Sequence, residues 1–64
     1  MYLVFFRTND VFLAEEKLIN NSINVEIVPT PVQDKAYCGV CVETKEKDLQ
    51  KINNILLNME YKQF

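Results

Sequence analysis

Histidine and tryptophan are absent from this chain, and glycine occurs once, proline twice and cysteine twice. The missing histidine removes the commonest general base and metal ligand at neutral pH. Seven basic and nine acidic residues give a net charge of −2, and no cluster of Lys and Arg gathers on one face. The sequence therefore argues against phosphate-driven binding of nucleic acid.

We expect no targeting leader. Met1 leads directly into the apolar run Tyr2-Leu3-Val4-Phe5-Phe6, with no basic leader and no small-residue cleavage site. The run is too short for a signal peptide or a membrane span. We expect a cytoplasmic protein with no membrane partner, in which two cysteines are thiols rather than a structural disulfide.

The length sets a limit on the kind of site. We expect the 64 residues to form a single domain, 1–64, and a chain of this size buries only about 60% of its unfolded surface. An apolar fraction of 48% is ample for a globular core. One small core leaves little room for an enclosed active site, which favours a site on the surface.

The apolar spacing predicts six elements in the order βαββαβ. The expected strands are 2–6, 23–28, 38–44 and 61–64, and the expected helices are 10–20 and 48–59. This order predicts an α+β fold, a ferredoxin-like two-layer sandwich with an antiparallel sheet. We expect the first and third strands to be central and parallel, with both helices covering one face.

Side-chain patterns assign faces to these elements. Thr8, Asn9 and Asp10 are each able to cap the first helix. In the third strand Val40 and Val42 mark the core face, with Cys38 in phase and Cys41 on the opposite side. The predicted core between helices and sheet includes Leu18, Ile52, Ile55 and Leu56, and the predicted apolar residues of the uncovered sheet face are Leu3, Phe5, Val28 and Cys41.

Both prolines, the glycine and both cysteines fall between residues 29 and 42. Cys38 and Cys41 are three residues apart, roughly 10 Å in an extended strand, whereas a disulfide needs Cα atoms within about 7 Å. Two thiols without histidine cannot complete a zinc site, so we expect no metal and no cofactor. The remaining interpretations are a packed, buried thiol, which suits Cys41, and a reactive thiol, which suits Cys38.

Four nearby residues would support a reactive Cys38. Gly39 carries no side chain and allows close approach to the backbone. Lys35 supplies positive charge that favours a thiolate. Pro29 and Pro31 end the preceding strand, because proline removes donors from the ladder, and they begin the loop that leads to Cys38.

Several short motifs follow one another along nearly the whole chain. They are Phe5-Phe6, Ala14-Glu15-Glu16-Lys17-Leu18, Ile23-Asn24-Val25, Pro29-Thr30-Pro31 and Cys38-Gly39. In this order they resemble a small bacterial family of selenium/sulfur carrier-like proteins. The chain departs from the family at Asn21-Ser22, where members often have a glycine, and at Cys41, where a small apolar residue is expected.

The resemblance implies that Cys38 matches the family cysteine and is the carrier residue. The hypothesis is then a carrier rather than a catalyst, which holds a sulfur or selenium atom for donor and acceptor proteins. Two alternatives remain. One is a non-enzymatic interaction domain whose uncovered sheet face pairs with a second copy, as a homodimer, or with another protein. The other is a small-molecule regulatory domain, for which the sequence has no ligand signature.

Overall fold

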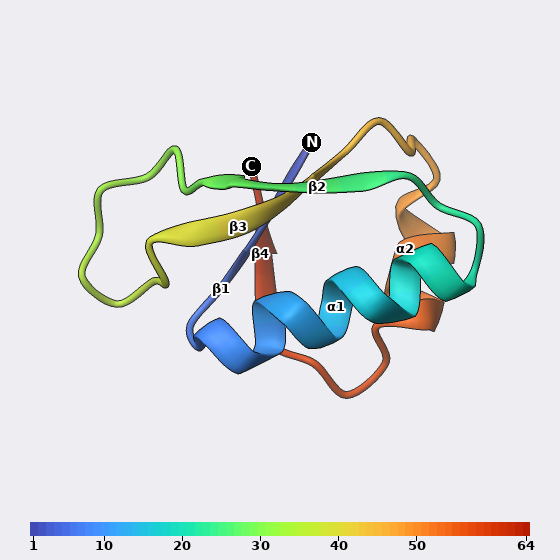
Figure 1. The fold of residues 1–64 in the computed structure, drawn as a ribbon, viewed down its shortest axis with the longest axis horizontal. Coiled ribbons are helices and arrows are strands. Elements are labelled where there is room, and N and C mark those ends of the chain that lie inside the picture. The colour runs from blue at the N-terminus through green and yellow to red at the C-terminus, as the bar shows by residue number, and fades with distance from the viewer.

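The computed structural model describes residues 1–64 and confirms the predicted βαββαβ order. The elements are β1 (Tyr2–Phe5), α1 (Thr8–Asn20), β2 (Val25–Pro29), β3 (Val40–Thr44), α2 (Leu49–Ile55) and β4 (Tyr61–Gln63). The four strands form one antiparallel sheet in the order β2-β3-β1-β4 (Figure 1). This is the ferredoxin-like α+β sandwich that the sequence predicts.

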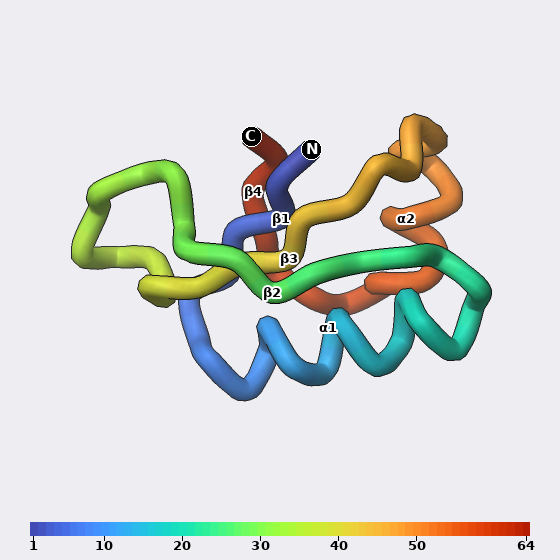
Figure 2. The backbone as a smooth tube through the Cα atoms, turned by 45° about the horizontal axis from the view of Figure 1, so that its top comes forward, coloured from blue at the N-terminus to red at the C-terminus, as the bar shows by residue number.

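The prediction that β1 and β3 run parallel is wrong. Tyr2 pairs with Glu43 and Leu3 with Val42, which is an antiparallel register. The reason lies in the crossover. Helix α1 returns the chain so that β2 runs parallel to β1 without touching it, and β3 reverses direction after the loop 30–39 and enters the gap between them (Figure 2).

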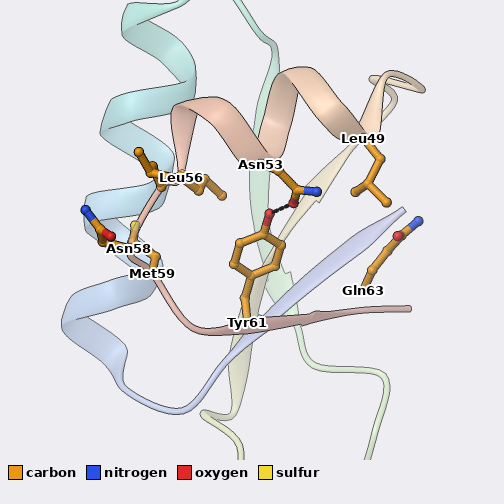
Figure 3. Close-up of a pocket in the computed structure, with 8 residues that line it drawn as sticks. Leu49, Asn53, Leu56, Asn58, Met59, Tyr61 and Gln63 are labelled. Atoms are coloured by element: carbon orange, nitrogen blue, oxygen red, sulfur yellow. Dashed lines mark hydrogen bonds between the residues drawn. The ribbon is translucent and has the colours of Figure 1, made fainter.

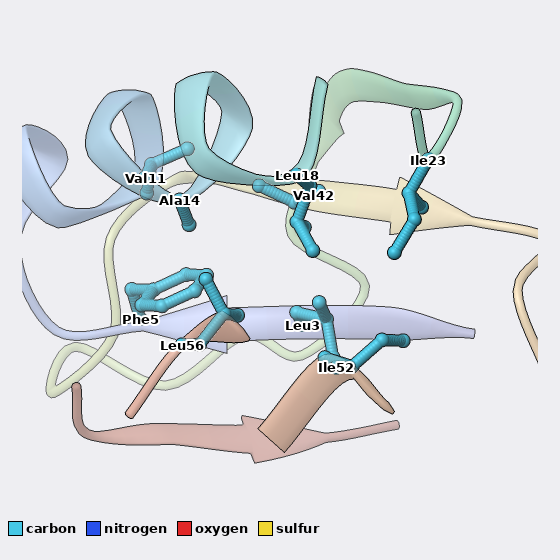
Figure 4. Close-up of a cluster of buried hydrophobic side chains, with 9 residues drawn as sticks. All are labelled: Leu3, Phe5, Val11, Ala14, Leu18, Ile23, Val42, Ile52 and Leu56. Carbon is cyan, nitrogen blue, oxygen red and sulfur yellow. The ribbon is translucent and has the colours of Figure 1, made fainter. Parts of the chain in front are cut away.

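The core lies between the two helices and one face of the sheet. Figure 4 shows Val11, Ala14 and Leu18 pointing from α1 toward the strands. Ile52 from α2 and Leu56 directly after it enter the same cluster, so both helices cover the same face. Burying side chains of this size stabilises a fold by about 1.5–3 kcal/mol each. Ile55 is partly buried and packs against this core, as predicted.

The two faces of β1 are assigned differently from the prediction. Leu3 and Phe5 lie in the core beneath the helices and not on the uncovered face. Both faces of this strand are apolar, so the sequence pattern alone gives no direction. The phase of β3 was predicted correctly, because Val42 belongs to the core cluster and Cys41 does not.

The helix ends show which polar residues act as caps. The N-cap of α1 is Arg7, without a side-chain cap, so Thr8, Asn9 and Asp10 do not have the predicted capping role. The N-cap of α2 is Asp48, whose side chain accepts a hydrogen bond from Lys51 N at 3.1 Å. Helix α2 ends at Ile55, earlier than predicted.

The C-terminal end of α1 is a Schellman motif. Ile23 N donates to Leu18 O and Ser22 N donates to Ile19 O, both at 2.9 Å. Ser22 has a φ of 63°, in the left-handed region that favours glycine. This turn brings Ile23 into the core (Figure 4). Neither helix has the length and apolar character that a membrane span requires.

Candidate functional site

The loop between β2 and β3, residues 30–39, lies beside the start of α1 (Figure 1). Cys38 belongs to this loop and not to β3, which begins two residues later than predicted. Its side chain is half-exposed and packs against the core cluster from the helix-covered side. A thiol in this position is anchored by the core and is still open to solvent.

The backbone of Cys38 is held by β1 and by Thr30, the residue that follows β2. Its N–H donates to Phe5 O of β1 at 2.8 Å. Its carbonyl accepts from Thr30 Oγ1 at 2.6 Å, and Thr30 N donates to the carbonyl of Gly39 at 3.0 Å. Thr30 stands between Pro29 and Pro31, so the middle residue of Pro-Thr-Pro joins that motif to Cys-Gly.

The side chain of Cys38 meets the first residue of α1. Thr8 Oγ1 lies 3.2 Å from Cys38 Sγ. This hydrogen bond, followed by those from the backbone of Val40 and Gly39, lowers the pKa of the Cys38 thiol from its ordinary value, against the opposing effect of desolvation. Hydrogen bonds to the charged form favour a thiolate, which is the nucleophilic state.

Cys41 has the opposite environment. It is fully buried on the sheet face away from the helices, and its Sγ donates to Pro29 O at 3.8 Å. Burial raises the pKa of its thiol. Both cysteines are free. The two thiols therefore differ in exposure, in sheet face and in the direction of their pKa shifts.

An aromatic cluster lies on the uncovered face, the face on which Cys41 is buried. Tyr37 stacks on Phe6 with centroids 5.1 Å apart and meets Phe64 edge-on at 6.1 Å. Phe6 and Phe64 flank Val4 on this face, since Phe64 pairs with Tyr2 and side chains alternate along β1. Continuing the register of β1 and β3 places Cys41 opposite Val4, and both side chains are fully buried on this face. We call Phe6, Tyr37 and Phe64 the aromatic cover.

The residues predicted to support Cys38 are Pro29, Pro31, Lys35 and Gly39. Lys35 and Pro31 are exposed. The groups that lower the pKa of Cys38 are Thr8, Val40 and Gly39, not Lys35. A Cβ built at Gly39 would meet no atom within 4 Å, so no close approach of backbone requires a glycine there.

The hollow between α2 and β4 lies apart from Cys38. Its lining includes Leu49, Asn53, Met59 and Tyr61, and none of its lining residues comes from the loop 30–39 (Figure 3). The Tyr61 hydroxyl donates to Asn53 Oδ1 across this hollow. No three side chains of His, Cys, Asp and Glu type gather anywhere in the chain.

Three residues of this site, Thr30, Tyr37 and Thr8, were not predicted from the sequence as neighbours of Cys38. Thr30 was within reach, since a polar residue between two prolines has few roles other than bonding a neighbouring chain segment. Tyr37 directly precedes Cys38, so the alternation of side chains along an extended chain would have predicted its ring on the uncovered face, opposite to Cys38. Thr8 had no sequence signal, because its contact joins residues 30 positions apart.

The chain was compared with known proteins in three ways. No curated protein matches it, and no solved structure matches it. A family model does match, over residues 1–63, and its description is "Putative Se/S carrier protein-like". A match across that length, over a chain whose Cys-Gly and Pro-Thr-Pro motifs are joined by hydrogen bonds, places this protein in the Se/S carrier-like family.

Proposed function

We propose that Cys38 is a carrier thiol, which takes a sulfur or selenium atom from a donor protein and passes it to an acceptor protein. The observation that carries the proposal is the half-exposed Cys38 Sγ, 3.2 Å from Thr8 Oγ1 and with a lowered pKa. Membership of the Se/S carrier-like family supports it. The proposal places this chemistry in the cytoplasm, where thiols stay reduced.

Loading on Cys38 is a substitution at sulfur and needs no external oxidant. The Cys38 thiolate attacks the outer sulfur of a persulfide on the donor. A new S–S bond forms at Cys38 Sγ, the donor's S–S bond breaks, and its electron pair leaves on the donor's thiolate. A selenium atom would be taken in the same way, as a perselenide.

The site suits a carrier better than an independent catalyst. Cys38 lies in a surface loop and is half-exposed, so a partner protein can reach the sulfur. No histidine is available to move a proton. The donor and the acceptor would therefore contribute the remaining groups, and this chain would contribute a positioned thiolate.

Association of two copies through the uncovered sheet face stays a prediction. The structure gives it less support than the sequence did, because Leu3 and Phe5 lie in the core. Glu26 also pairs with Glu43 on that face, so two copies face to face would bring their carboxylates together.

The test of the carrier proposal uses the wild-type chain with Cys38→Ser and Cys41→Ser variants. Each protein is incubated with a low-molecular-weight persulfide and desalted without reductant, and its intact mass is measured by mass spectrometry. Variants are needed because Lys35 and Lys45 place both cysteines in one tryptic peptide. We expect one added sulfur atom on the wild type and on Cys41→Ser, and none on Cys38→Ser.

Two results would contradict the proposal. One is an added sulfur that remains in Cys38→Ser and disappears in Cys41→Ser. The other is a wild type that gains sulfur no faster than free cysteine does. Either result would move the function away from Cys38 and toward the interaction-domain alternative.

A further inference from the structure

We propose that the Thr8 hydroxyl stabilises the thiolate that Cys38 becomes when it gives up its cargo, so that Thr8 serves the unloading step. This inference rests on the proposed function of Cys38 and assigns a reacting-atom contact to a residue of another element. Thr8 Oγ1 lies 3.2 Å from Cys38 Sγ. Sγ is the atom on which negative charge forms when the S–S bond breaks.

The contact is held in place from both sides. Thr8 is the first residue of α1, a helix of 13 residues, so its position follows that of the helix. Cys38 is tied to Phe5 through its N–H and to Thr30 through its carbonyl. Cys38 cannot move away without breaking its hydrogen bond to β1 or its hydrogen bond to Thr30, the residue that follows β2.

The hydroxyl is free for this role. The N-cap of α1 is Arg7 and has no side-chain cap, so Thr8 does not cap its own helix. In the neutral pair either atom can be the donor. A thiolate has no proton to give, so charge on Cys38 makes the Thr8 hydroxyl the donor.

The same hydrogen bond affects loading and unloading in opposite directions. In unloading, an acceptor thiolate attacks the outer sulfur of the Cys38 persulfide. The S–S bond of that persulfide breaks, and its electron pair stays on Cys38 Sγ. A leaving thiol with a lower pKa leaves faster. In loading, Cys38 is the nucleophile, and a thiolate of lower pKa is intrinsically less nucleophilic. When the attacking thiol of each step is fully ionised, a hydroxyl at Cys38 Sγ therefore favours release of the cargo over its capture.

The experiment compares Thr8→Val, which keeps the shape of the side chain, with Thr8→Ser, which keeps the hydroxyl. The wild-type chain and both variants are loaded with a low-molecular-weight persulfide, and unloading by 2-mercaptoethanol is followed by intact mass. We expect Thr8→Val to unload roughly tenfold more slowly, which is the effect of losing one hydrogen bond to a charged group. Thr8→Ser should unload at close to the wild-type rate.

Loading supplies the readout that a structural role would not move. At alkaline pH, where Cys38 is ionised in every protein, Thr8→Val should load as fast as the wild type or faster. A variant that is merely distorted would load and unload more slowly together, and that result would overturn the inference. Equal unloading by Thr8→Val and the wild type would overturn it as well.

Alkylation with iodoacetamide separates this inference from the carrier proposal. The pH midpoint of Cys38 alkylation should rise in Thr8→Val and stay near the wild-type value in Thr8→Ser, whether or not a persulfide forms. An unchanged midpoint in Thr8→Val overturns the role of Thr8 and leaves the carrier proposal standing. A shifted midpoint in a protein that never accepts sulfur supports the Thr8 contact and overturns the carrier proposal.

Discussion

Replacing Tyr37 by alanine should open the uncovered sheet face and make Cys41 reactive. The wild-type ring contacts Phe6 and Phe64, and each aromatic pair contributes about 0.5–1.5 kcal/mol beyond the area it buries. Losing both pairs should lower the free energy of unfolding by about 2 kcal/mol. In a domain of this size a loss of 1 kcal/mol lowers Tm by roughly 4–8 °C, so the variant should melt well below the wild type.

The assay is thiol labelling under native conditions, with thermal unfolding followed by circular dichroism. We expect one rapidly labelled thiol in the wild type and two in Tyr37→Ala, because loss of the ring should open the face on which Cys41 is buried. Tyr37→Phe keeps both ring contacts and should label and melt like the wild type. The hydroxyl of Tyr37 makes no hydrogen bond that this substitution would remove.

A second control separates local opening from global unfolding. Ile52→Val removes one methyl group from the core, at a cost of about 0.5–1.5 kcal/mol, and Ile52 lies on the helix-covered side of the sheet. It should leave Cys41 protected. A Tyr37→Ala protein that stays folded with Cys41 unlabelled would refute the expected protection of Cys41 by the aromatic cover. An unchanged Tm would refute the expected contribution of the cover to stability.

Two further predictions concern stability. Ser22→Gly should stabilise the fold by about 1 kcal/mol, because serine at a φ of 63° carries a steric cost that glycine avoids. Urea unfolding would measure the gain, and a less stable variant would contradict the prediction. The raised pKa of Cys41 stabilises the fold below the ordinary thiol pKa, and this contribution is lost as the pH rises through the folded-state pKa. The lowered pKa of Cys38 acts in the opposite sense, through a contribution that is complete above the unfolded-state pKa and lost as the pH falls through the folded-state value. Urea unfolding across alkaline pH should therefore show a shallower decline in Cys41→Ala and a steeper one in Cys38→Ser than in the wild type; parallel curves would contradict both signs.

Much of the fold follows from periodicity in the sequence. The stripe Val11, Ala14 and Leu18 identifies the buried side of α1, and the spacing of Ile52 and Leu56 does the same for the second helical segment. The faces of β1 could not be predicted, because every residue from Tyr2 to Phe6 is compatible with burial. Only the packing of α1 decides that Leu3 and Phe5 face the helices.

The candidate site was predictable only in part. Cys38 is marked by its own chemistry and by the neighbouring glycine and prolines. The start of α1 was misassigned because Thr8, Asn9 and Asp10 are all residues that cap helices, and the structure uses none of them as the N-cap. A threonine that bonds a side chain instead of its own helix is recognisable only after the loop 30–39 is placed beside α1.

The spacing of the two cysteines has a consequence for a carrier. A second thiol near a Cys38 persulfide could attack the inner sulfur, form a Cys38–Cys41 disulfide and release the cargo as hydrosulfide. Two features oppose that reaction. Cys38 packs on the helix-covered side of the sheet, whereas Cys41 is absent from that cluster and fully buried on the other face. Burial also raises the pKa of Cys41, which keeps it a thiol rather than the thiolate that would attack.

Tyr37, one residue of the aromatic cover, links the surroundings of the two cysteines. Tyr37 precedes Cys38, and its ring packs with Phe6 and Phe64 on the sheet face opposite to the Cys38 thiol, the face on which Cys41 is buried. The segment that holds the proposed carrier sulfur on one side of the sheet thus also places an aromatic ring on the side where the competing sulfur is buried. In a C-x-x-C pair built for redox exchange the two thiols must meet, and here a single loop keeps them apart. The geometry therefore favours cargo held on Cys38 alone over a dithiol that cycles between reduced and oxidised forms.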